Sequence, residues 1–154
     1  MTRPAQFTCA AHMAGLPDAV DFVEAFCAGS GLAHRTRQRL ALMVEELFTN
    51  VLEHGAKAGA GAQIRLVLDA AADAIELLFE DTAAPFDPLR HAREHPASVD
   101  APTPDRPVGG LGIHLVLSLA ADARYAREDG CNRLRLRLAY GDDDRRGAAP
   151  RESA

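Results

Sequence analysis

The sequence predicts an α+β fold: a two-layer α/β sandwich whose mixed, mostly antiparallel sheet carries helices on one face. Three observations predict it. Segments with apolar residues at steps of three and four, typical of helices, are interspersed with short alternating segments that are typical of strands. The later strand segments come in adjacent pairs joined by short turns. The 154 residues contain no internal repeat or domain linker, so we expect a single layered domain.

The first third of the chain predicts an edge strand and two helices. QFTCAAHM, residues 6–13, is a weak strand candidate, and Pro17 suits the first turn of a helix that ends at the glycines of residues 29–31. The apolar positions of that helix are Val20, Val23, Phe26 and Cys27. A longer helix is predicted from Leu32 to about Glu53. Its buried stripe is Leu40, Met43, Val44, Leu47 and Val51.

Two hairpins account for the other strands. After the glycine-rich residues 56–62, the segments QIRLVLD and AIELLFED alternate in polarity and are joined by the short connection AAAD. Near the end, ARYARED and NRLRLRLAY predict a final hairpin around Asp129 and Gly130.

The chain changes character between the hairpins. Residues 88–107 hold five prolines and little apolar periodicity, which predicts a long irregular segment of the kind that forms a functional loop or lid. The glycines that follow open a helix that runs to about Ala121. The polar tail, residues 141–154, is predicted to be disordered, which leaves residues 1–140 as the folded domain.

Charge and composition exclude several classes of protein. With 17 basic and 22 acidic residues the net charge is −5, which argues against direct binding of nucleic acid. No apolar run reaches the roughly 18 residues of a membrane span, and the N-terminus lacks the apolar core of a secretory signal. We therefore expect a cytoplasmic protein with no membrane partner, whose three widely spaced cysteines stay as thiols.

Glu46 and Asn50 form the first of three candidate site clusters, in MVEELFTNVLEHG at residues 43–55. Four positions apart on a helix, they point from the same side and lie roughly 6 Å from one another. A carboxylate accepts a proton from a hydroxyl group, and an amide oxygen is a suitable ligand for Mg2+. A solvated polar helix face is the alternative interpretation of this pair.

Asp81 belongs to the second cluster, FEDTAAPFDP at residues 79–88. It follows an apolar strand and precedes a turn of small residues. A carboxylate held at a strand end accepts hydrogen bonds strongly, and the amino group of adenine is a suitable donor. A capping aspartate in a turn explains this motif equally well when it is taken alone.

The third cluster is GGLGIHLVLSLAA at residues 109–121, where three glycines stand at the start of a helix. Glycine disfavours helix formation, so the cluster needs a reason. Free N–H groups at a helix start attract anions, and glycines let phosphate oxygens approach the backbone closely. A tight turn into a packed helix is the alternative interpretation.

Together, the three clusters resemble the GHKL superfamily of ATPases and kinases. In chain order they run E-x-x-x-N, D-x-A-x-P-F-D-P and G-G-L-G-I-H-L, with the proline-rich lid before the last. Within the superfamily, the chain is similar to the stand-alone anti-sigma factor and serine kinase family over about residues 5–140. The P-F-D-P run at residues 85–88 is typical of this branch, and D-G-x-N-x-L-x-L at 129–136 is similar to its closing hairpin.

The resemblance implies a role for each cluster. Glu46 matches the family's general base, Asn50 its magnesium-binding asparagine and Asp81 its adenine-binding aspartate. The residues that match its phosphate loop are Gly109, Gly110, Leu111 and Gly112. The chain departs from the pattern at Ala83, in the adenine-binding motif, where the family usually has glycine. An alanine is compatible if its φ is negative, but its methyl group is expected to crowd the base.

The resemblance also implies a function. It predicts a protein serine/threonine kinase that uses ATP and Mg2+, phosphorylates an anti-anti-sigma protein of the STAS fold, sequesters a sigma factor and forms a homodimer. One alternative is a nucleotide-binding regulatory module without kinase activity, which Ala83 and the lack of a lysine in the lid favour. A detached sensor-kinase domain ranks last, since 154 residues leave no room for a dimerising helix with a phosphoacceptor histidine.

Two further groups of residues are weaker candidates. Arg90, Arg93 and Arg106 could neutralise phosphate in the lid, although no motif match gives them that role. His54 lies one turn beyond Asn50 and is expected to form a wall of the base pocket or a partly exposed helix end.

Overall fold

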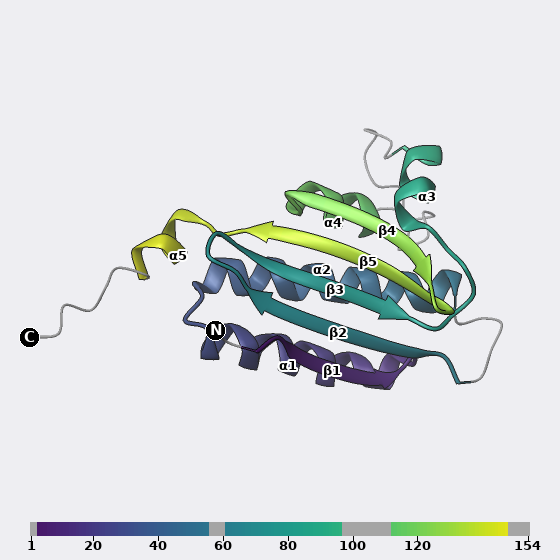
Figure 1. The fold of residues 1–154 in the computed structure, drawn as a ribbon, viewed down its shortest axis with the longest axis horizontal. Helices are drawn as coiled ribbons and strands as arrows, with labels where there is room; N and C mark the ends of the chain where they lie inside the picture. Colours follow the sequence, from purple (N-terminus) through teal and green to yellow (C-terminus); the bar gives the residue numbers. More distant parts are fainter. Residues whose placement is uncertain (1–2, 56–60, 97–111, 148–154) are drawn as a thin grey trace, which may run out of the picture.

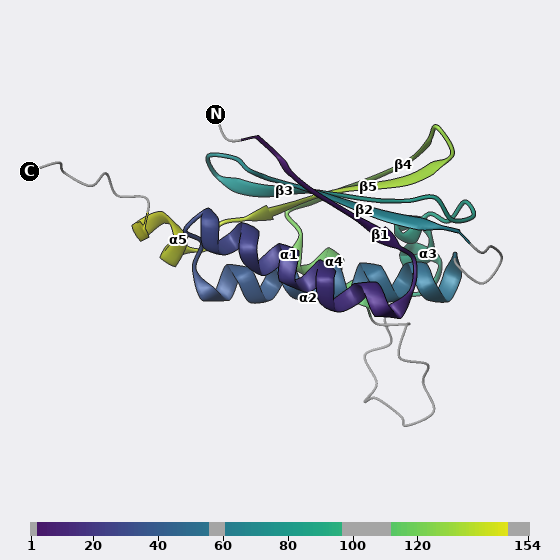
Figure 2. The ribbon, with the colours of Figure 1, turned by 90° about the horizontal axis from the view of Figure 1, so that it is seen from below.

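The computed structural model describes residues 3–55, 61–96 and 112–147, except for the side chains of 145–147. This part of the chain forms one five-stranded sheet with a layer of helices on one of its faces (Figure 1, Figure 2). The α+β fold predicted from the sequence, with helices on one face, is confirmed.

The sheet is antiparallel in all four strand pairings of the described residues, so it is more uniform than the mixed sheet that was predicted. In spatial order its strands are β1 (Ala5–Ala10), β2 (Gln63–Ala70), β3 (Ala74–Asp81), β5 (Cys131–Ala139) and β4 (Asp122–Glu128). β1 is an edge strand, as expected, and both predicted hairpins form. Asp129 and Gly130 turn between β4 and β5 with φ values of 52° and 74°, the backbone of a two-residue hairpin turn.

Three helices form the second layer. α2 (His34–His54) lies between α1 (Leu16–Gly29) and α4 (Gly112–Leu119), under the sheet (Figure 2). A short 3-10 helix, η1 (Met13–Gly15), leads from β1 into α1. Across residues 3–55, 61–96 and 112–147, no helix has both the length and the apolar character needed to cross a membrane.

α2 supplies the centre of the hydrophobic core, because a helix flanks it on either side and the sheet covers it. All five residues of its predicted stripe are buried, and Phe48 joins them with no exposed surface. Alternate residues of the central strands meet this stripe, namely Ile64, Leu66, Leu68, Leu134, Leu136 and Leu138. Since burying each such side chain stabilises the fold by about 1.5–3 kcal/mol, α2 is firmly held, and its polar residues have fixed positions.

The segment after Asp87 differs from its prediction. The sequence predicts an irregular segment over 88–107, but Pro88–Glu94 form helix α3. Asp87 caps this helix, since its Oδ1 accepts hydrogen bonds from two backbone N–H groups of the first turn, at 2.9 and 3.1 Å. Pro88 takes the first helical position, where a missing N–H is harmless. Residues 97–107 of the predicted lid lie outside the described residues.

The tail also differs from its prediction. Disorder was expected from Gly141, but Asp142–Gly147 form helix α5. Asp144 reaches back to the start of α2, where the N-cap residue Ala33 has no side-chain acceptor. A carboxylate 111 positions away in the chain thus serves as the cap of α2. Residues 148–154 lie outside the described part.

The Asp144 carboxylate is well satisfied. It accepts hydrogen bonds from the Ala33 N–H, from the Thr36 hydroxyl and, at 3.0 Å, from the Gly141 N–H. Burial alone would raise the pKa of this carboxyl, but the three hydrogen bonds outweigh burial and lower the pKa below its ordinary value of 3.8. The charged form of Asp144 therefore stabilises the folded protein.

Removal of this cap should destabilise the fold. We expect Asp144→Ala to lower the free energy of unfolding by about 1–2 kcal/mol, because the N–H of Ala33 and the hydroxyl of Thr36 lose their acceptor. Because folding lowers the pKa of Asp144, its carboxylate stabilises the folded protein at pH values above its unfolded pKa of 3.8. This contribution to the free energy of unfolding is lost as the pH falls through the lower pKa of the folded state. Urea unfolding across about pH 3–7 measures both effects.

The matched control is Asp143→Ala, because Asp143 is the exposed neighbour of Asp144 on the same helix. This control should change the free energy of unfolding by less than about 0.5 kcal/mol. Equal effects of the two substitutions at neutral pH would show that the carboxylate of Asp144 does not cap α2.

Candidate functional site

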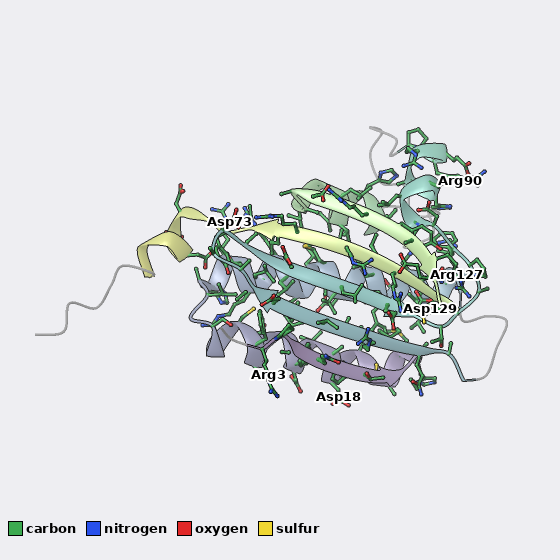
Figure 3. The ribbon with its side chains drawn as sticks, in the orientation of Figure 1. Arg3, Asp18, Asp73, Arg90, Arg127 and Asp129 are labelled. Carbon is green, nitrogen blue, oxygen red and sulfur yellow. The ribbon has the colours of Figure 1, made fainter. Side chains whose placement is uncertain are left out.

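One cleft brings together side chains from α2, β3, β4 and β5. It lies at the end of the sheet that Arg127 and Asp129 mark in Figure 3, opposite the end with Asp73. The room that it leaves for water-sized molecules is only about 30 Å3, so its lining side chains nearly fill the cleft in this structure. Asn50 and Asp81, from two of the predicted clusters, both line it. The other lining residues are Leu47, Val51, Gly55, Phe79, Phe86, Pro88, Tyr125, Asn132 and Leu134.

Asp81 ends β3 and is only 7% exposed. Its Oδ1 accepts two hydrogen bonds, from the Ala83 N–H at 3.0 Å and from Asn132 Nδ2 at 2.9 Å. Burial raises the pKa of this carboxyl, and the two hydrogen bonds offset part of the rise. Within the described ranges no group donates to Oδ2, so this oxygen is available to accept a hydrogen bond from a ligand in the cleft.

Asn132, directly opposite Asp81 on β5, holds this part of the cleft together. Its Nδ2 donates to Asp81 Oδ1 and to the Ala84 carbonyl, both at 2.9 Å. Its Oδ1 accepts from the Phe86 N–H at 3.1 Å and from the Tyr125 hydroxyl at 2.7 Å. Every donor and acceptor of the amide is therefore used. In the sequence Asn132 stands in the D-G-x-N-x-L motif without a role of its own, because its importance depends on the β3–β5 register.

Ala83 follows Asp81 in the turn and is buried. Among non-glycine residues of the described part, only Asp129 has a positive φ, so the backbone at Ala83 is compatible with alanine. The Ala83 carbonyl accepts a hydrogen bond from Arg127 Nη1 at 2.8 Å. Its methyl group faces Gly55, the C-cap of α2, where a Cβ would lie only 2.7 Å from the Ala83 Cβ. Ala83 is not among the lining residues of the cleft, although Gly55, against which its methyl group packs, is one of them.

Glu46 lies one turn before Asn50 on α2 and is half-buried beside the start of α4. Burial raises the pKa of its carboxyl, and the nearby Glu45 and Glu53 raise it further. A carboxylate whose pKa is moved toward neutrality is better suited to accept a proton. Glu46 does not line the cleft itself, so the structure places the candidate base next to the cleft, one helical turn along from Asn50.

Gly112 is the residue of the glycine cluster that the structure describes, and it begins α4. A Cβ at this position would collide with Glu46 Oε2, so a side chain here would push the Glu46 carboxylate out of its present position beside α4. Gly109, Gly110 and Leu111 lie outside the described residues. The first and third predicted clusters are thus adjacent at Glu46 and Gly112, and the first and second share the cleft through Asn50 and Asp81.

Asn50 lines the cleft and has the side-chain oxygen that could hold a metal ion there. Within the described ranges, no group of three or more His, Cys, Asp or Glu side chains surrounds a common metal position. Mg2+ usually takes one or two protein oxygens and fills its other positions with water and substrate phosphates. The residues present therefore fit a magnesium ion that arrives with a phosphate ligand.

The remaining candidates lie outside the cleft. Arg90 forms an ion pair with Glu94 at 2.9 Å on the exposed side of α3 (Figure 3), and Arg93 is exposed on the same helix. Neither lines the cleft, and Arg106 lies outside the described residues. The ring of His54 stacks on Phe86, with centroids 4.5 Å apart and planes inclined by 3°. Phe86 lines the cleft, whereas His54 is the exposed last residue of α2, so the second of the two expectations for His54, an exposed helix end, is confirmed.

The chain belongs to the family of histidine kinase-like ATPase domains. The model of this family matches residues 9–138, from β1 to β5, and so includes both the cleft and the Glu46–Gly112 contact. The match places the chain in the GHKL superfamily, whose domains bind ATP, generally with Mg2+. A comparison with curated proteins gives no match. Fold, cleft and family together support a nucleotide-binding, kinase-like domain.

The contact between Gly55 and Ala83 can be tested by exchanging the two residues. We expect Gly55→Ala alone to lower the free energy of unfolding by about 1–3 kcal/mol, because the new methyl group overlaps the Ala83 Cβ. The double variant Gly55→Ala/Ala83→Gly should recover at least about 1 kcal/mol of this loss, since only one methyl group then occupies the space. Urea unfolding of both single variants and the double variant measures this coupling. Strictly additive effects would mean that the two residues do not pack together.

Proposed function

We propose that this chain is an anti-sigma factor and protein serine/threonine kinase that transfers the γ-phosphoryl group of Mg-ATP to a STAS-type anti-anti-sigma protein. The observation that carries the proposal is the position of Glu46. It is a half-buried carboxylate with a raised pKa, one turn from Asn50 and in contact with Gly112. The sequence resemblance to the anti-sigma factor and serine kinase family supports the choice of substrate.

Asp81 and Asn50 would hold the nucleotide from two sides of the cleft. Asp81 Oδ2 would accept a hydrogen bond from the amino group of adenine, since Oδ1 is already occupied. The side-chain oxygen of Asn50 would bind Mg2+, which supplies charge neutralisation to the phosphates when it is bound. By resemblance, the backbone N–H groups of residues 109–112 would face the phosphate chain.

Glu46 would act on the protein substrate. Its carboxylate accepts the proton of the serine hydroxyl while the serine oxygen bonds to the γ-phosphorus and the bond from that phosphorus to the ADP oxygen breaks. Phosphoryl transfer depends mostly on positioning and on charge neutralisation, so one base and a few polar residues are sufficient. The buried stripe of α2 supports this role, because it keeps Glu46 and Asn50 at a constant separation.

The partners are part of the same proposal. The STAS-fold protein is the phosphoryl acceptor, and a sigma factor is the partner that the chain sequesters as a cytoplasmic homodimer. Transcription would thus be regulated without direct contact to nucleic acid. The net charge of −5 supports binding to proteins over binding to nucleic acid.

The alternative function is a nucleotide-binding regulatory module without kinase activity. One of its supports was the crowding of the base by Ala83, and this support is weakened because the methyl group faces Gly55. Incubation with γ-labelled ATP and candidate STAS proteins separates the two functions. Label on a serine of the STAS protein supports the kinase, and nucleotide binding without transfer to any candidate supports the module.

Glu46→Gln should abolish phosphoryl transfer and leave nucleotide binding nearly unchanged. The amide keeps the shape of the side chain but cannot accept the serine proton, so we expect the transfer rate to fall by about 100-fold or more. In the native chain, the rate should rise with pH through the pKa of Glu46, which lies above its ordinary value of 4.5. Labelled-phosphate transfer and calorimetric titration with ADP measure the two properties separately.

Glu45→Gln is the matched control for this substitution. Glu45 is the chain neighbour of Glu46 and points in a different direction from α2, so its variant should keep most of the transfer activity. Equal losses of transfer and of ADP affinity in Glu46→Gln would contradict the assignment of Glu46 as the base.

Asp81→Asn should weaken nucleotide binding selectively. The new amide can turn its NH2 group toward the adenine amino group, so that a donor meets a donor, and the lost hydrogen bond to a charged group costs about 2–3 kcal/mol. We therefore expect the dissociation constant for ATP to rise by roughly 30- to 150-fold. Titration of the native chain and the variant with ATP and with GTP measures the dissociation constants. An equal fold-change in the dissociation constants of both nucleotides would argue against recognition of adenine by Asp81.

A further inference from the structure

Four of the six histidines in the chain form a connected group beside the cleft, and two of them, His54 and His91, contact the ring of Phe86. The Phe86 ring lies flat on that of His54, and the His91 ring contacts both, with centroid distances of 5.3 and 5.0 Å. His91 stacks in turn on His95, at 4.2 Å and 25°. We call the side chains of His54, Phe86, His91 and His95 the ring stack. His114 adds a hydrogen-bond contact of 2.7 Å between its Nε2 and the carbonyl oxygen of His95.

The ring stack connects elements that are distant in the sequence. His54 is the last residue of α2, Phe86 lies in the turn after β3, and His91 belongs to α3. α3 packs on the core through Ala92 and Leu89, and the ring contacts are a second attachment that joins it to His54 of α2 and to Phe86. His114, at the side of the stack, belongs to α4.

Phe86 links the ring stack to the cleft. Its ring lines the cleft, and its backbone N–H donates to Asn132 Oδ1. The same Asn132 amide holds Asp81 through its Nδ2. A change in the position of Phe86 therefore alters both the wall of the cleft and the hydrogen bonds that orient Asp81.

His91 is surrounded mostly by other imidazoles. His54 faces it from α2, His114 from α4 and His95 from α3 itself, while Glu94 is the acidic group that acts on it. Glu94 also forms an ion pair with Arg90, whose Nε lies 2.9 Å from Glu94 Oε1. Glu53 is the acidic group near His54, with 3.9 Å between Glu53 Oε2 and His54 Nε2. β4 also packs against α3, but its Tyr125 and Arg127 bond to Asn132 and to the Ala83 carbonyl. Burial lowers the pKa of His91 first, and the neighbouring histidines lower it further.

We propose that the ring stack is a proton-sensitive latch, which holds α3 and Phe86 against the cleft when its imidazoles are neutral and releases them when the imidazoles are protonated. Neutral rings stack without repulsion, whereas protonation places like charges on adjoining rings of the same stack. The consequence for nucleotide affinity rests on the proposed function of the cleft. The release of α3 itself does not.

The direction of the pH dependence follows from the pKa of His91. Because this pKa lies below its ordinary value of 6.5, the undocked state binds the proton more tightly than the docked state. Docking of α3 is therefore complete above the ordinary value and weakens as the pH falls below it. This window covers the range in which histidine acts as a physiological switch.

The test compares the native chain with His91→Phe, which keeps an aromatic ring in the stack but cannot be protonated. NMR measurements of the backbone order of α3 and of ring–ring NOEs to Phe86, at about pH 7.5 and about pH 5.5, report docking directly. The native chain should lose these NOEs and the order of α3 at the lower pH, and His91→Phe should keep both. His91→Gln removes the ring and the charge together, so it should loosen α3 at both pH values.

His34→Gln is the control, because His34 is exposed at the opposite end of α2 and should leave the pH response unchanged. Titration with ADP should show an affinity loss of about threefold or more in the native chain at the lower pH, and a smaller loss in His91→Phe. A native α3 that stays docked at both pH values, or an equal pH response in His91→Phe, overturns the latch. Loss of docking without any ADP binding leaves the latch intact and counts against the proposed function.

Discussion

The geometry of the cleft depends on the hydrogen bonds of the Asn132 side-chain amide. This amide is buried, and its four hydrogen bonds reach Asp81, the turn after β3 and Tyr125. A buried donor or acceptor left without a partner costs about 1–3 kcal/mol, so a displacement of any of these neighbours is opposed by the loss of a hydrogen bond. The polar wall of the cleft is therefore set before any ligand binds, and among the described residues Asp81 receives hydrogen bonds at its Oδ1 and none at its Oδ2.

α2 contributes the second constraint, because it carries both Glu46 and Asn50. Its middle is fixed by the hydrophobic core, its N-terminus by the carboxylate of Asp144, and its C-terminus by the close packing of Gly55 on Ala83. A helix held at three points keeps a base and a metal ligand at a constant separation. Reactions that depend on positioning, such as phosphoryl transfer, benefit most from this rigidity.

Features of the fold that depend on local residue patterns could be predicted from the sequence. Features that depend on contacts between residues far apart in the chain could not. The apolar stripe of α2 and the Asp-Gly turn at residues 129–130 are strong local signals, and both are present in the structure. The contributions of Asn132 and Asp144 depend on strand register and on a partner 111 positions away, which no local pattern contains. α3 is a different case, since Asp87 and Pro88 carry a helix-start signal that the many prolines after it obscured.

A crystal structure with Mg2+ and a non-hydrolysable ATP analogue tests the central claim most directly, namely that one nucleotide site joins α2, the end of β3 and the start of α4. The account predicts the adenine amino group within hydrogen-bond distance of Asp81 Oδ2, the side-chain oxygen of Asn50 on the metal ion, and Glu46 open to an incoming hydroxyl beside the γ-phosphate. A nucleotide bound elsewhere, or one whose adenine and metal contact neither Asp81 nor Asn50, would contradict it.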